Sequence, residues 1–319
     1  MTLTKIYLLG TLTMFLMALW DVFARYGISV LDGSPPLFSA VVLFSSAFAL
    51  IIVAGPGRGG LAAMKNIYTW LFAIFQILTA VFENYAYALI STTEANVLFR
   101  VSILLSLLMA WAAFGRKPDK HDWIGSIIVA IGILYMCATL NENIRFFALL
   151  NIGISSIFFV ARTFVAETHP VAAYAPTIRD QCRVTGIVLL CTSALFVVFY
   201  AIIGLIFDNI GASSAAGNLP TLKDFQNGPA LFAGFICGVF VVSSAKFLYF
   251  YLSRKITTEN YMIIGAFLPL TTLIVEVIWS HIGVLDISSI DQSDYISGLI
   301  VILGAVYIGY FRSKKRISN

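Results

Sequence analysis

The sequence predicts an all-α integral membrane protein with ten transmembrane helices, arranged as two inverted five-helix repeats. Three observations support this prediction: an apolar composition, apolar runs long enough to cross a bilayer, and similarity between the two halves of the chain. Of the 319 residues, 60% are hydrophobic and 11% are charged, whereas soluble domains have about 45–50% and about 25%. So few charges cannot cover the surface of a soluble protein of this size.

Ten apolar runs have about the length of a membrane span. The hydrocarbon core is about 30 Å thick and a helix rises about 1.5 Å per residue, so a span needs about 20 apolar residues. The first run carries Asp21 and Arg25 and lacks a small-residue cleavage site, so we expect a retained helix. The predicted spans are 7–30, 36–55, 68–90, 93–114, 123–140, 144–166, 184–207, 229–252, 257–281 and 295–311.

The basic residues predict the orientation of the chain. If the N-terminus is cytoplasmic, fourteen of the twenty Lys and Arg lie in inner segments, and only Arg145 and Lys223 lie in outer ones. Because cytoplasmic loops are enriched in Lys and Arg, we expect a multi-pass protein of the cell (inner) membrane with both termini cytoplasmic. The net charge of +4 comes largely from these loops, so we expect no nucleic-acid partner.

The two halves of the chain are similar in sequence. Residues 122–136 and 294–308 are identical at six of fifteen positions, and Thr92-Thr-Glu94 matches Thr257-Thr-Glu259. Five spans per repeat is an odd number, so the second repeat must enter the membrane from the opposite side. Inverted repeats of this kind are typical of alternating-access transporters, although a duplication retained only for packing is the alternative. The predicted repeats are 1–141 and 142–319, the second with an inserted outer loop near 208–228.

Several short motifs resemble those of a known family. These are Trp20 with a basic residue five positions later, Tyr85-Ala-Tyr-Ala-Leu89 ahead of the first Thr-Thr-Glu, and Tyr249-Phe-Tyr251 ahead of the second, with Pro269 ten residues later. Together with the ten-span pattern, they resemble the drug/metabolite transporter superfamily, in particular its EamA-like branch. The resemblance implies a central cavity lined by spans one, three, four, six, eight and nine, and export of amino acids, nucleotides, sugars or similar compounds.

The chain departs from that family at two places. Leu104 stands in the first repeat where the second has Pro269, and a Gly115-Arg116-Lys117 turn replaces the Glu common at the cytoplasmic end of span four. We therefore do not transfer the family's residue roles to these two places.

Seven charged residues lie within the predicted spans. A charge at the bilayer centre costs about 2.5–3.5 kcal/mol on insertion scales, so such residues usually face a partner or water. Four of them lie near enough to span ends to reach the interface instead, so for these four a functional and an interfacial role remain open. The seven are Asp21, Glu83 and Arg100, together with these four, Arg25, Arg162, Lys246 and Glu276.

The spacing of these charged residues predicts one ion pair within a helix and one residue at each of two transport gates. Asp21 and Arg25 are four residues apart, so they can pair on one helix face. Arg25 and Arg162 occupy matching positions of the two repeats, which would place them near opposite membrane faces, where each would serve one gate.

The strongest candidate for a substrate anchor is Arg100, with Glu83 as its resting partner or as the contact for a cationic end of the same ligand. Guanidinium stays charged and matches carboxylate or phosphate oxygens in a planar fork. The rival interpretation is a permanent Glu83–Arg100 ion pair that only holds two helices together. Trp20, Tyr85, Tyr87, Lys246 and Tyr249 complete the predicted substrate-binding set, although the aromatic residues also fit a packing role.

The predicted function is secondary transport of a small polar metabolite, zwitterionic or anionic, such as an amino acid. The three histidines, which are far apart in sequence, show neither metal-ligand spacing nor a nucleophile context, and the chain lacks a phosphate-binding loop. We therefore expect no catalytic residues, metal or cofactor. Coupled H⁺ or Na⁺, exchange and the substrate gradient remain open as energy sources, as do a monomer and a homodimer. The alternatives are a lipid-modifying membrane enzyme and a sensor that does not transport.

The orientation can be tested by cysteine labelling. Because Lys117 and Lys314 fall on the predicted cytoplasmic side, Lys117→Cys and Lys314→Cys should resist a membrane-impermeant maleimide added outside intact cells. Lys223→Cys, on the predicted outer side, should react and serves as the control. Labelling of the first two from outside would reverse the predicted topology.

Overall fold

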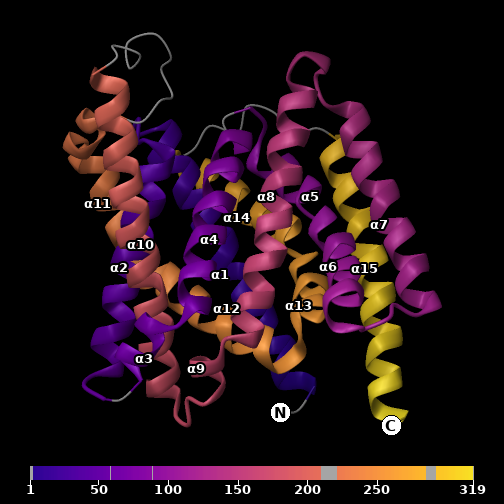
Figure 1. The fold of residues 1–319 in the computed structure, drawn as a ribbon. Coiled ribbons are helices and arrows are strands. Elements are labelled where there is room, and N and C mark those ends of the chain that lie inside the picture. Colours follow the sequence, from indigo (N-terminus) through magenta and orange to yellow (C-terminus); the bar gives the residue numbers. More distant parts are fainter. Residues whose placement is uncertain (1–2, 58, 88, 210–220, 285–291, 319) are drawn as a thin grey trace.

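A computed structural model of the chain describes residues 3–57, 59–87, 89–209, 221–284 and 292–318. Over this part the fold is almost entirely helical, and ten helical segments are long and apolar enough to cross a membrane. Both termini lie on the same side of the bundle, as an even number of spans requires (Figure 1). The predicted class and the predicted number of spans are therefore confirmed. Much of the predicted insertion near 208–228 lies outside the described residues.

Seven spans are single helices and three are interrupted. The single helices are α1 (Leu3–Ser29), α2 (Pro35–Ala54), α4 (Ile67–Tyr87), α7 (Lys120–Thr139), α8 (Glu142–Thr168), α10 (Ile178–Asn209) and α15 (Gln292–Ser318). Span four consists of α5 (Thr92–Leu98) and α6 (Val101–Phe114), and span nine consists of α13 (Thr258–Gly265) and α14 (Leu268–His281). In span eight, a π-helical turn at Gly238–Val242 joins α11 (Gly228–Cys237) to α12 (Ser243–Ile256). Short helices α3 (Gly60–Lys65) and α9 (Pro170–Ala173) lie in loops on the side of the termini (Figure 1).

The seventh span begins earlier than the predicted residue 184. Helix α10 starts at Ile178 and includes Arg183, whose guanidinium donates to the carbonyl oxygens of Ala54, Gly55 and Pro56 at 3.1–3.2 Å. These carbonyls belong to the last residue of α2 and the loop after it, where a helix leaves its carbonyls unpaired. Hydropathy did not predict residues 178–183 as part of this span because they include charged residues. The charge of Arg183 is stabilised by the carbonyl oxygens at the end of α2.

The break in span nine has a clear cause in the sequence. Pro269 lacks an N–H, so the carbonyl of Gly265, four residues earlier, receives no helical hydrogen bond from it. The guanidinium of Arg100 donates a hydrogen bond to this carbonyl instead, with Nη1 2.5 Å from the oxygen. Gly265 leaves room for this approach, because a Cβ there would lie 2.9 Å from Nη1.

The break in span four involves the same arginine. The backbone N–H of Arg100 donates to Val97 O at 3.1 Å in a tight turn. Its side-chain Nε donates to the carbonyl oxygen of Asn96, four residues earlier, at 2.9 Å. A side-chain donor thus replaces the helical backbone bond at this point. In the alignment of the Thr-Thr-Glu motifs, Arg100 and Gly265 are equivalent positions, so the two breaks meet at this contact.

Helices α7 and α15, which carry the similar segments 122–136 and 294–308, pack through glycines. A Cβ built on Gly304 would lie 2.8 Å from Gly125 O, and one on Gly125 would lie 2.8 Å from Gly304 O. Small residues allow membrane helices to approach this closely. We call this contact between α7 and α15 the seam. At one end of it, the guanidinium of Arg312 donates to the two carboxylate oxygens of Asp122 at 2.7 and 3.0 Å. The pairing of the last helix of each half is consistent with the predicted inverted repeat.

This seam gives a stability test. Gly304→Ala places a methyl group against backbone atoms, so we expect the free energy of unfolding to fall by about 1–3 kcal/mol, seen as a lower melting temperature of the purified protein in detergent. Gly153→Ala on α8 is the matched control, since its Cβ would meet no atom within 4 Å and alanine favours helix. Equal stability of the two variants would contradict close packing at the seam.

Candidate functional site

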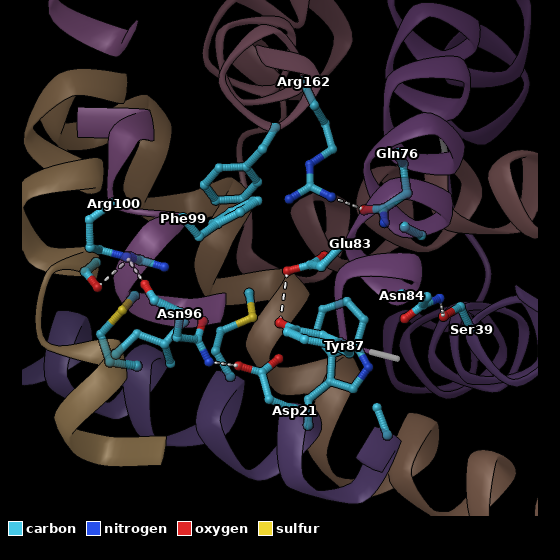
Figure 2. A pocket seen from close by; sticks show the side chains of 18 of the residues that line it. Asp21, Ser39, Gln76, Glu83, Asn84, Tyr87, Asn96, Phe99, Arg100 and Arg162 are labelled. Carbon is cyan, nitrogen blue, oxygen red and sulfur yellow. Dashed lines mark hydrogen bonds between the residues drawn. The ribbon is translucent and has the colours of Figure 1, made fainter. Parts of the chain in front are cut away.

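A cavity with charged and amide side chains in its wall lies at the centre of the bundle, and its empty space amounts to about 800 Å³ with open solvent included. Its walls come from spans one, two, three, four, six and nine, and Figure 2 shows most of the side chains. The implied spans agree with this set except that span two contributes Ser39 and span eight contributes no lining residue in the described part of the chain. The lining residues are Met14, Met17, Trp20, Asp21, Ala24, Ser39, Gln76, Ala80, Glu83, Asn84, Tyr87, Asn96, Phe99, Arg100, Phe159, Arg162, Tyr261, Met262, Gly265 and Leu268.

Arg100 lies in the break of span four and is 2% exposed. Its Nε and Nη1 are held by the carbonyls of Asn96 and Gly265, whereas its buried Nη2 has no hydrogen-bond partner among the described residues. A buried guanidinium N–H without a partner is costly. Two backbone carbonyls therefore fix the orientation of this side chain and leave one donor free.

Glu83 does not form the predicted ion pair with Arg100 among the described residues. Its carboxylate accepts a hydrogen bond from the hydroxyl of Tyr87 at 3.0 Å, one helical turn later on α4 (Figure 2). The rival interpretation, in which a direct Glu83–Arg100 pair permanently joins spans three and four, is therefore wrong for this conformation. Each of the two charged groups is held by a neutral partner.

Asp21 also has a neutral partner. Its carboxylate accepts a hydrogen bond from Asn96 Nδ2 at 3.1 Å (Figure 2). The same nitrogen lies 3.3 Å from the hydroxyl of Thr272 on α14. The predicted Asp21–Arg25 pair is wrong, because Arg25 extends to a different helix. Asp21 therefore presents a carboxylate to the cavity, and no cation of the described residues is bonded to it.

Arg25 pairs with Glu276, with Nη1 2.9 Å from Oε1. The other oxygen of Glu276 accepts from the hydroxyl of Thr93 at 2.8 Å. This group, here called the far cluster, joins α1, α14 and α5 toward the side opposite the termini. Glu276 is 1% exposed, so the interfacial role left open for it is excluded.

A second ionic group, here called the near cluster, lies on the side of the termini. Arg116 contacts Glu167 on α8 at 2.6 Å and Glu259 on α13 at 3.1 Å, and the hydroxyl of Thr258 donates to Glu167 at 2.6 Å. Partial burial lowers the pKa of Arg116, but the hydrogen bond to Glu167 and the charge of Glu259 outweigh it, so the pKa is raised. The sequence predicted no role for Glu167 or Glu259.

Arg162 and Lys246 are buried rather than interfacial, with 4% and 0% of their surface exposed. Arg162 Nη1 and Lys246 Nζ both donate to the side-chain oxygen of Gln76, the second at 2.9 Å. Arg162 lines the cavity, so its side chain faces the interior of the bundle. Lys246 lies behind the cavity wall, with Nζ 4.6 Å from the ring centre of Trp20.

The predicted aromatic residues divide into two groups. Trp20 and Tyr87 line the cavity. Tyr249 is fully buried, donates to the hydroxyl of Thr163 at 2.8 Å and packs edge-on against Tyr261. Tyr85 and Tyr249 are not among the lining residues, and Tyr249 therefore has the packing role that was left open.

Three neutral amides in the cavity wall were not predicted from the sequence: Gln76, Asn84 and Asn96. Asn84 donates to Ser39 Oγ and to the carbonyl of Pro35, both at 3.2 Å. An amide within an apolar run is costly to bury without hydrogen-bond partners. Such an amide therefore indicates a polar site inside the protein, as a charged residue does. Across the described residues, no group of three His, Cys, Asp or Glu side chains could hold a metal ion.

Comparison with known protein families gives a match over the first part of the chain. Residues 4–138 match the EamA-like transporter family. One solved crystal structure superimposes on this fold with a TM-score of 0.62 over 97% of this chain and 99% of that chain, at 14% identity, and at this identity the likeness concerns the fold alone. Comparison with curated proteins gives no match.

Proposed function

We propose that the protein is a membrane transporter of small molecules, because residues 4–138 match the EamA-like transporter family. Its substrate, in this proposal, is a zwitterionic or anionic metabolite such as an amino acid. The observation that carries this proposal is the free Nη2 of the buried Arg100, at the wall of the central cavity. A carboxylate or phosphate oxygen would supply the partner that this donor lacks.

The carboxylates of the cavity support a zwitterion. Asp21 and Glu83 line the same space as Arg100 and are bonded to neutral groups. A ligand with an acid group on Arg100 and an ammonium near Asp21 or Glu83 would satisfy both kinds of site group. Trp20 and Tyr87 supply aromatic faces for the remainder of the ligand.

We propose alternating access as the mechanism, with 1–141 and 142–319 as the two repeats. The far cluster and the near cluster lie toward opposite ends of the bundle, and in each a threonine of the Thr-Thr-Glu motif, Thr93 or Thr258, bonds a glutamate of another helix. Equivalent motif positions thus close opposite ends, which suits two oppositely oriented halves. The substrate gradient, exchange, or coupled H⁺ or Na⁺ would supply the energy.

The proposed setting is the cell (inner) membrane with both termini cytoplasmic. The partners are the substrate and membrane lipids. Substrate counterflow into sealed vesicles containing the purified protein tests the function, because neither a lipid-modifying enzyme nor a sensor gives saturable exchange. Absence of counterflow for amino acids, organic acids, nucleotides and sugars would refute it.

Arg100→Lys tests the anchor. Lysine keeps the charge but loses the planar fork that holds two carbonyls and a ligand oxygen together, so we expect affinity for the best-bound acid in an amino-acid and organic-acid screen to fall about tenfold or more, with the fold retained. Binding is measured by the ligand-induced rise in melting temperature. Arg145→Lys is the matched control, because Arg145 also donates to backbone carbonyls but lies outside the cavity. Unchanged affinity in Arg100→Lys would remove Arg100 from the site.

Glu276→Gln and Glu167→Gln test the two clusters as gates. Glu276→Gln removes the ion pair of the far cluster, and Glu167→Gln removes one of the two ion pairs of the near cluster. Each loss is worth about 1 kcal/mol, so exposure of the cavity to that side should rise about fivefold. The measurement is labelling of an Ala80→Cys reporter in the cavity wall by an impermeant maleimide, from either side of sealed vesicles.

We expect faster labelling from the outside in Glu276→Gln and from the inside in Glu167→Gln. The control is Glu142→Gln, which changes an exposed carboxylate at the start of α8. The same labelling pattern in all three variants would make the clusters structural anchors.

A further inference from the structure

One wall of the cavity holds two cations on a single neutral acceptor. Arg162 Nη1 and Lys246 Nζ both donate to the side-chain oxygen of Gln76. All three residues are buried, and among the described residues neither cation lies within ion-pairing distance of a carboxylate. An amide oxygen carries no net charge, so it satisfies hydrogen bonding without neutralising this pair.

Directional donors remain free at this wall. Arg162 Nε is buried and has no hydrogen-bond partner among the described residues. The two cations fix the oxygen of Gln76, and its amide nitrogen donates to no described residue, so this nitrogen is a second available donor. Both residues line the cavity.

Aromatic rings stabilise the cations only partly. The guanidinium of Arg162 lies 4.7 Å from the ring centre of Phe159 and 5.4 Å from that of Tyr249, a geometry that offsets some loss of hydration. A ring face, however, accepts no strong directional hydrogen bond from Nε. The need for an acceptor at this nitrogen therefore persists.

The cavity as a whole has an excess of positive charge. Among the lining residues, Arg100 and Arg162 give two cations, and Asp21 and Glu83 give two carboxylates. Lys246, directly behind the wall, adds a third cation, so the cavity and its wall carry a net charge of +1 when all five groups are ionised. Arg162 and Gln76 lie apart from Arg100 in Figure 2, with Glu83 between Arg162 and Tyr87. The two unsatisfied arginines therefore face the same space from separate positions.

We propose that Arg162 and Gln76 form a second acid-binding subsite, and that the substrate class is a small compound with two acid groups, one ammonium group and a net charge of −1. One acid group binds Arg100 and the other binds Arg162 Nε and Gln76 Nε2, while Asp21 and Glu83 accept the ammonium group. Lys246 is a positioning residue, since it holds the oxygen of Gln76 without lining the cavity. The inference rests on the proposed function, which supplies the Arg100 end of the ligand.

The test compares acidic amino acids with their monoamides on the purified full-length protein. The probes are L-glutamate with L-glutamine, and L-aspartate with L-asparagine, and binding is measured by ligand-induced thermal stabilisation. We expect the acid to bind the parent about tenfold more tightly than its amide, because a charge-assisted contact is lost in the amide. In Arg162→Gln this preference should fall to about unity while binding of the amide is retained.

Arg162→Lys controls for a folding defect caused by loss of the buried charge, because lysine keeps that charge. We expect this variant to retain part of the preference for the acid over its amide. Arg145→Gln is the control for loss of an arginine outside the cavity. Equal binding of acid and amide by the parent, or an undiminished preference in Arg162→Gln, would overturn the subsite. In either case, monoacid binding that depends on Arg100 would leave the proposed function standing. Absence of binding by all four probes overturns the subsite, and the proposed function then fails only if counterflow is also absent.

Discussion

The bond between Arg100 and the carbonyl of Gly265 is the contact on which the centre of this protein depends. Within a bilayer, a backbone group that leaves the helical pattern must find a partner inside the protein. Pro269 frees that carbonyl, and Arg100 satisfies it at 2.5 Å while using its Nε for Asn96. One buried side chain thus permits both helix breaks and is itself held with a donor facing the cavity.

The sequence predicts the helices of this fold better than it predicts their partners. Run length and charge give ten spans, because a span is a local property of about 20 residues. The partner of Arg25 is Glu276, 251 positions away, rather than Asp21 on the same helix, since the tertiary packing decides which carboxylate is reached. The burial of Arg162 and Lys246 has the same cause, because neighbouring helices cover their side chains.

The two Thr-Thr-Glu motifs can be compared by the contacts that their residues make in the structure. The Thr-Thr-Glu motifs look alike, yet Glu94 caps its own helix by bonding the backbone of Ser91, whereas Glu259 pairs with Arg116. The threonines, in contrast, have matching tasks: Thr93 and Thr258 each bond a glutamate from another helix. The two motifs therefore differ in the contacts of their glutamates and agree in the contacts of their threonines, which is consistent with the predicted repeat.

The choice of partners within the cavity bears on how a ligand could be released. Asp21, Glu83 and Arg162 are bonded to Asn96, Tyr87 and Gln76, which are neutral. If the same charges were paired directly, an entering ligand would have to break a buried ion pair, and breaking such a pair is strongly unfavourable. Neutral partners hold each charge in place, and they leave its electrostatic attraction available to a ligand. A carrier must bind its cargo and then let it go, and charges held in this way allow both steps.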